Sequence, residues 1–288
     1  MYDNSQLQTY KNCPEQYRLK YIEQLRKREE GVDEHDKEFG KAIHTGLEAF
    51  YKGESEAGSI EKFRLAYQEQ LSAEDLAKTQ ENGVLLLSAY IKHYKEEDKN
   101  WTIKAVEVAD TFEIAPGVPF TVKIDLVVEQ QGCIYFVDHK TTGKAFNWTY
   151  WGQFEPNSQI TAYTAYCQAK FGECSGGIIN GLQLGFRQRA YKGEAAGFHY
   201  SFQRQLFNRN RQQIEAWKQD TLWWIKQING MKEATNHIGS WRKNEGQCRF
   251  CSYKEICISV NDEQIKEQLY EKVNATEYLE NVNDNNSG

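Results

Sequence analysis

The sequence lacks the apolar segments that would anchor it in a membrane or mark it for export. Among its 288 residues no apolar run approaches the roughly 18 residues that a membrane span needs, and the longest candidates, such as residues 84–87, are short. The first residues, MYDNSQLQTYKNCPEQYRL, contain no apolar signal core. These absences predict a cytoplasmic protein with no membrane partner.

Excess positive charge and an even set of cysteines are absent as well. Lysine and arginine number 35 against 41 acidic residues, so the formal net charge is −6. Nucleic-acid binders are often basic, so the overall charge does not indicate one, although a local basic surface stays compatible with binding. Seven cysteines without an export signal argue against a disulfide framework. The length allows one large globular domain or two small ones.

The apolar spacing predicts helices that flank a strand-rich centre. Helices are expected over residues 5–28 with a break at Cys13, 38–52, about 59–78, 82–98, 158–171, 202–229 and about 262–280. Strands are expected within residues 101–137, where QQG at 130–132 predicts a hairpin turn, and within 176–191. The last residues, NVNDNNSG, are predicted to be disordered. This order favours an α/β fold with a mixed central sheet flanked by helices.

Charged side chains end the predicted hairpin. Alternation along a strand places Asp138 and Lys140 on one face and His139 on the other, and strand pairing would bring Asp125 near Asp138. Two carboxylates held close repel each other, and a divalent cation such as Mg²⁺ or Mn²⁺ offsets that repulsion through oxygen ligands. The alternative is an ordinary surface ion pair, which contributes little.

The stretch KIDLVVEQQGCIYFVDHKT resembles the core of PD-(D/E)xK nucleases, in the branch that includes RecB-type nuclease domains and Cas4 exonucleases. Two further stretches occur in the family's order: GKAIH (40–44) is similar to its G-x3-H motif, and QITAY (159–163) to its Q-x3-Y motif. VEVADTFEI carries Glu107, which resembles an acidic residue on the preceding strand, although Glu113 competes for that assignment. The resemblance implies metal ligands at His44, Asp125, Asp138 and the backbone carbonyl of His139, a catalytic Lys140, and accessory Gln159 and Tyr163.

A cysteine set joins the two ends of the sequence. Cys248, Cys251 and Cys257 form C-x2-C-x5-C, and Cys13 lies alone in NCPEQY. Four thiolates can hold a [4Fe–4S] cluster or a zinc ion, and the spacing does not choose between them. The opening SQLQTYKNCPEQYRLKY is similar to that of the iron–sulfur members of the family, so the resemblance favours the cluster as a structural clasp. The alternative is a set of unliganded buried cysteines.

The resemblance covers about residues 1–260 and implies a restriction-endonuclease-like nuclease domain there, with a helical insertion at about 45–100 and cluster-binding ends. Residues 261–288 would form a C-terminal helix and a disordered tail. The implied function is a Mg²⁺- or Mn²⁺-dependent DNA exonuclease in recombination, repair or phage DNA metabolism, inside a bacterial cell or phage-infected host. Its substrate would be DNA that is single-stranded or has single-stranded ends, and a helicase or recombination protein would be its partner.

Two alternatives remain open at this stage. One is a catalytically inactive, cluster-stabilised protein that binds DNA or acts as a scaffold, and the other is a zinc-stabilised protein with an unrelated role. Basic stretches at 187–192, 204–211 and 240–244 are candidates for phosphate contacts, or else form solvated basic faces.

Overall fold

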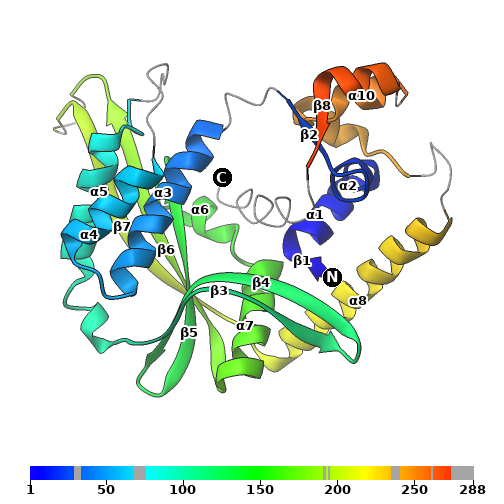
Figure 1. Ribbon diagram of the computed structural model, residues 1–288. Coiled ribbons are helices and arrows are strands. Elements are labelled where there is room, and N and C mark those ends of the chain that lie inside the picture. The colour runs from blue at the N-terminus through cyan, green and yellow to red at the C-terminus, as the bar shows by residue number, and fades with distance from the viewer. Residues whose placement is uncertain are drawn as a thin grey trace. The chain divides into compact units, whose positions relative to one another are not determined.

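Figure 1 shows a computed structural model of the chain. It describes residues 1–28, 34–67, 76–190, 193, 195–234, 241–260 and 262–273. The described residues fall into two compact units. The first unit takes residues up to 28, residues 113–121 and the chain from Glu215 onward, and the second takes residues 34–112 and 122–214. The predicted domains, residues 1–260 and 261–288, are not tested by these compact units and stay a prediction.

The strands form a mixed sheet and a separate pair. In chain order they are β1 (Tyr2–Asp3), β2 (Leu25–Lys27), β3 (Thr102–Ala115), β4 (Val118–Gln130), β5 (Cys133–Thr142), β6 (Cys174–Arg187), β7 (Gly197–Asn208) and β8 (Tyr270–Lys272). The sheet order is β1-β4-β5-β6-β7, with β3 also paired to β4, while β2 pairs with β8. Because β5 and β6 run parallel and β4–β5 and β6–β7 run antiparallel, the predicted mixed sheet is confirmed.

Helices follow the predicted order for most of the chain. The α-helices are α1 (Asn4–Asn12), α2 (Pro14–Tyr17), α3 (Glu34–Tyr51), α4 (Glu56–Ala66), α5 (Gln80–Tyr94), α6 (Trp148–Gly152), α7 (Ser158–Phe171), α8 (Arg211–Ala234), α9 (Lys254–Ile258) and α10 (Glu263–Leu269). Three short helices of other types are η1 (Arg18–Ile22), η2 (Asp98–Asn100) and η3 (Glu245–Phe250). None of the helices in the described chain is long and apolar enough to cross a membrane.

In the second unit the two faces of the sheet are covered by different helices (Figure 1). Apolar residues of α3, α4 and α5, such as Ile43 and Leu47 of α3, pack in one core with Leu126 of β4 and Val137 of β5. The neighbouring side chain on β5, Phe136, points to the opposite face, where α7 lies against β5 and β6. Residues 138–140, which follow Val137, therefore lie in a part of the sheet that helices cover on both faces.

Several predicted elements differ from the structure. Residues 202–208 belong to β7 rather than to a helix, which begins only at Arg211, because these residues pair with residues 176–182 of β6. Residues 25–27 and 270–272 form β2 and β8 instead of extending helices. Residues 76–78 are turns, not the end of a helix, and the predictions for 68–75 and 274–288 fall outside the described residues.

Close packing at Gly83 generates a stability prediction. A Cβ atom at Gly83 of α5 would lie 2.0 Å from Cζ of Phe63, whereas one at Gly230 of α8 meets nothing within 4 Å. We expect Gly83→Ala to lower the free energy of unfolding by about 1–3 kcal/mol because the core is overpacked. Gly230→Ala should raise it by about 0.5–1 kcal/mol because alanine is the better helix former. Chemical denaturation measures both, and equal effects of the two variants would contradict this packing.

Candidate functional site

The β4–β5 hairpin brings two buried aspartates together. Leu126 and Val137 form the last pair of the β4–β5 ladder, so Asp125 and Asp138 lie just beyond the paired residues. One carboxylate oxygen of Asp125, Oδ2, accepts a hydrogen bond of 2.7 Å from the backbone N–H of His139. Burial raises the pKa of Asp138, with Asp125 adding to the rise and Lys140 opposing it. Burial acts the same way on Asp125, but the charge and hydrogen bond of His44, with a smaller effect of Lys140, outweigh it and hold its pKa below the ordinary value. The two carboxyls therefore differ in character.

Lys140 forms a buried ion pair with Asp138. Its Nζ lies 2.9 Å from Oδ2 of Asp138, and both side chains are nearly shielded from water. Burial lowers the pKa of Lys140, but Asp138 and Asp125 outweigh it, so the net pKa is raised and the ammonium stays charged. The hairpin thus holds one fixed positive charge beside two carboxylates.

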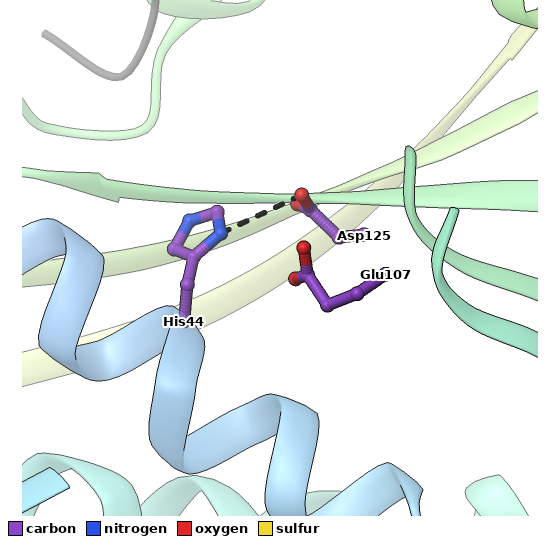
Figure 2. Close-up of side chains that lie close together, drawn as sticks. All are labelled: His44, Glu107 and Asp125. Carbon is purple, nitrogen blue, oxygen red and sulfur yellow. Dashed lines mark ion pairs between the residues drawn. The ribbon is translucent and has the colours of Figure 1, made fainter. Parts of the chain in front are cut away.

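A helix and two strands bring His44, Glu107 and Asp125 together. Their ligand atoms all lie within 4.8 Å of one another, and Figure 2 shows the three side chains converging from α3, β3 and β4. Nδ1 of His44 lies 3.5 Å from Oδ1 of Asp125. Its other nitrogen, Nε2, is buried without a hydrogen-bond partner among the residues that the structure describes. Nδ1 of His44 is the nitrogen that faces the two carboxylates. One imidazole nitrogen together with carboxylate oxygens fits a divalent cation, because donors of this kind bind Mg²⁺, Mn²⁺ and related ions.

Glu107 owes its place to an unusual backbone conformation. Its φ of +50° lies in the left-handed region, which residues other than glycine rarely adopt. Within a strand this conformation re-aims a side chain, and such strain concentrates at functional sites. Burial, helped by the charge of Asp125, raises the pKa of Glu107 to about 7. Glu113, the competing candidate, is exposed and falls in the other unit.

The predicted ligand set and the observed group overlap in two residues, His44 and Asp125. Among the described residues, Asp138 stands outside the group of three, and its carboxylate faces Lys140 instead. Glu107 takes the third place, although the sequence reasoning left its role open. The signal in the sequence was the resemblance of Glu107 to an acidic residue of the family. The left-handed backbone that directs its side chain toward His44 and Asp125 cannot be predicted from the residue types. Ligation by Asp138 and by the carbonyl of His139 stays a prediction.

Gln159 and Tyr163 bond to each other on α7. Nε2 of Gln159 donates to the Tyr163 hydroxyl at 2.8 Å, and the Tyr163 ring packs edge-on against Phe136 at 5.4 Å. Because Phe136 shares its strand face with Asp138, this pair belongs to the face that carries the ion pair. Their predicted accessory role stays a prediction.

Tyr150 of α6 was missed by the sequence reasoning. Burial raises its pKa to about 12, and the charge of Asp138 contributes to the rise, so its phenol stands near that carboxylate. No motif in the sequence marks this tyrosine, because α6 reaches the site only through the folding of the chain.

The four motif cysteines all belong to the first unit. Cys13 is buried, the other three are half-buried, and all are free thiols. Burial raises the pKa of Cys251, with Cys13 and Cys248 contributing, and it raises that of Cys257 to about 11, with Cys251 and Cys13 among the contributors. The thiols are therefore near enough to influence one another. Within the described chain, no three of them come within 4.8 Å of each other.

Two arginines of the basic stretch at 204–211 are not exposed for phosphate contacts. Arg204 and Arg209 are buried, and Arg209 donates to the Thr161 hydroxyl and to the Phe154 carbonyl. Of the three tryptophans in α8, Trp217 is buried as expected, whereas Trp223 is exposed.

The raised pKa of Glu107 generates a pH prediction for the metal-free protein. Between pH values of about 4.5 and 7 the folded state keeps a proton on Glu107 that the unfolded state releases. Stability from this group is therefore lost as the pH rises through that window. We expect wild type to lose about 2 kcal/mol more than Glu107→Gln between pH 5 and pH 8, a figure reduced from the full shift because water screens a partly exposed carboxyl. Urea unfolding of both proteins in a chelator measures this difference, and parallel pH profiles would contradict it.

The chain is similar to a known protein family and to solved structures. The family model described as the PD-(D/E)XK nuclease superfamily matches residues 4–258. A crystal structure described as a putative exonuclease from Eubacterium rectale is similar at 15% identity, covers 86% of each chain and has a TM-score of 0.49. A second, of SSO0001, has 12% identity, covers 76% of this chain and 84% of its own, and has a TM-score of 0.29. No curated protein matches at a significant level. Since the family model spans most of its length, the chain belongs to the PD-(D/E)XK nuclease superfamily.

Proposed function

We propose that the protein is a Mg²⁺- or Mn²⁺-dependent DNA exonuclease. The observation that carries the proposal is the convergence of His44, Glu107 and Asp125 beside the buried Asp138–Lys140 pair. Family membership supports a nuclease with DNA as its substrate. The resemblance of the motifs to RecB-type and Cas4 proteins supports the exonuclease mode, single-stranded ends, a helicase or recombination partner, and a role in recombination, repair or phage DNA metabolism.

The chain's own groups suit phosphodiester hydrolysis. His44, Glu107 and Asp125 would hold the cation, and Asp138 would be a further ligand. A divalent cation there supplies Lewis-acid assistance to hydrolysis of the phosphate. Lys140 keeps its charge where negative charge develops on phosphate oxygens, and Asp138 fixes the ammonium in place. The Asp138–Lys140 pair is the most deeply buried part of the site, so water screens its electrostatic interaction least.

The first test is cleavage of end-labelled single-stranded DNA. We expect cleavage with Mn²⁺, none with chelator, and a loss of about 10²–10³-fold or more in Asp125→Asn and Lys140→Met because each removes charge stabilisation. Lys170→Met is the control, since Lys170 is an exposed lysine paired with Asp110 of β3. Full activity in Lys140→Met would overturn the proposed mechanism.

Circular DNA distinguishes exonuclease from endonuclease action. An exonuclease degrades linear single strands and leaves closed circles intact, so equal loss of both would refute the exonuclease mode while leaving the nuclease. Tight DNA binding without cleavage at any Mn²⁺ concentration would instead support the alternative of an inactive DNA-binding or scaffolding protein.

For the cysteine set we propose a [4Fe–4S] cluster with a structural role, with zinc as the alternative. Four thiolates can hold either group. Burial and the neighbouring thiols raise the pKa of Cys251 and Cys257, and the choice of the cluster over zinc rests on the resemblance of the opening segment to the iron–sulfur members of the family. Cys251 and Cys257 also pack against the small core of Leu19, Tyr253 and Tyr270. The cluster would therefore join the opening helices to the C-terminal segment.

Optical spectra of anaerobically purified protein test this assignment. We expect absorbance near about 400 nm in wild type and its loss, with a lower unfolding midpoint, in Cys248→Ser. Cys133→Ser is the matched control because Cys133 is half-buried in β5, in the other unit. Stoichiometric zinc without iron in metal analysis would contradict the cluster.

A further inference from the structure

A row of three polar side chains crosses the sheet behind the site. His139 of β5 pairs with Asn180 of β6, and Asn180 pairs with Arg204 of β7. All three are buried on the face that α3 and α5 cover, opposite to Asp138. Buried polar groups are costly unless they are fully bonded, so the partners of this row are informative.

Arg204 is held rigidly at the outer end of the row. Its Nη1 lies 2.5 Å from Oδ1 of Asp98, and its Nη2 lies 3.2 Å from Oδ2. The guanidinium carbon stands 3.5 Å from the ring centre of Tyr94 and 4.2 Å from that of Trp101. Because the ion pair and two aromatic rings restrain it, Arg204 is a fixed donor for its neighbours.

This donor determines how Asn180 is oriented. Arginine carries donors only, so the side-chain oxygen of Asn180 must face Nε of Arg204, at 3.4 Å. The amide nitrogen then faces inward, where its two hydrogens reach the Tyr90 hydroxyl at 2.7 Å and Nδ1 of His139 at 2.6 Å. Every polar atom of the Asn180 side chain is used, and the reverse orientation would set two donors against each other.

The orientation of Asn180 in turn selects one form of His139. Because Nδ1 accepts from Asn180, the proton of the neutral imidazole is on Nε2. The Tyr51 ring stacks on the imidazole with centres 5.6 Å apart and planes 12° from parallel. Tyr51 belongs to α3, which also carries His44. His139 is thus clamped between the strand β6 and the helix of the metal-ligand candidate.

The clamp reaches the site through the backbone of His139. Its N–H donates to Oδ2 of Asp125, whose other oxygen, Oδ1, faces His44. Rotation of the His139 peptide would release that oxygen and free the carboxylate to turn away from His44. Supports of this kind behind metal ligands commonly tune affinity and activity by 10–100-fold.

We propose that Asn180, oriented by Arg204, is a positioning residue that sets the Asp125 carboxylate by fixing His139. The inference rests on the proposed function of the site as a metal-dependent nuclease. It assigns Asn180 and Arg204 no contact with DNA or metal.

The test compares Asn180→Leu and Arg204→Lys with a matched control, Arg209→Lys. Arg209 is also a buried arginine of the second unit, but its bonds go to Thr161 and Phe154 rather than to the row. Mn²⁺ affinity of metal-free protein is measured by electron paramagnetic resonance, alongside kcat and KM for DNA cleavage and the thermal midpoint. We expect about a tenfold loss of Mn²⁺ affinity and of kcat in both row variants, with KM for DNA unchanged, and less than a twofold change in Arg209→Lys.

A measurement on wild type covers the case in which the row variants fail to fold. Nitrogen-15 NMR of metal-free protein, with His139 assigned through a His139→Gln variant, should show the proton on Nε2. A proton on Nδ1 overturns the proposal, as do folded row variants that bind Mn²⁺ like wild type.

Failure of the proposed function gives a different pattern. Wild type that binds Mn²⁺ but cleaves no DNA would refute the nuclease, while weakened Mn²⁺ binding in the row variants would still support the positioning role. Wild type that binds no Mn²⁺ would overturn both.

Discussion

The site depends on the burial of two facing carboxylates. The charge of Asp125 raises the pKa of Asp138, and little water screens the repulsion between the two carboxylates. Positive groups resolve the conflict differently for each carboxyl: Lys140 pairs with Asp138, and His44 turns toward Asp125. A third acid, Glu107, has a raised pKa because it is buried and because Asp125 carries a negative charge close by. A cation bound among these residues would offset the repulsion between the acidic groups.

The scaffold of the second unit suits this task because the two faces of the sheet perform different work. Helix α7 lies over the face that carries the Asp138–Lys140 pair, and α3 to α5 cover the face that carries His139. Neighbouring residues of β5 therefore have different roles: Asp138 belongs to the ion pair, and His139 bonds through its backbone to Asp125. Burying the polar groups around Arg204 costs free energy that an apolar core would not lose. This cost is consistent with a network that orients His139 rather than one that stabilises the fold.

Much of the arrangement follows from local patterns in the sequence. The β4–β5 hairpin, the closeness of Lys140 to Asp138 and the bounds of helix α7 were all predicted from local patterns. Residues 202–208 were misassigned to a helix, because only pairing with β6 identifies them as a strand. The basic stretch that begins there was a candidate DNA surface, yet Arg204 is buried by partners such as Asp98 that lie far away in the sequence. Glu107 needed a left-handed backbone that no residue type announces.

The most direct test of the central claim is a crystal structure of the protein soaked in Mn²⁺, with the ion located by its anomalous scattering. The account predicts a peak within coordination distance of His44, Glu107 and Asp125. A peak elsewhere, or none at saturating Mn²⁺, would show that these three residues converge for another reason.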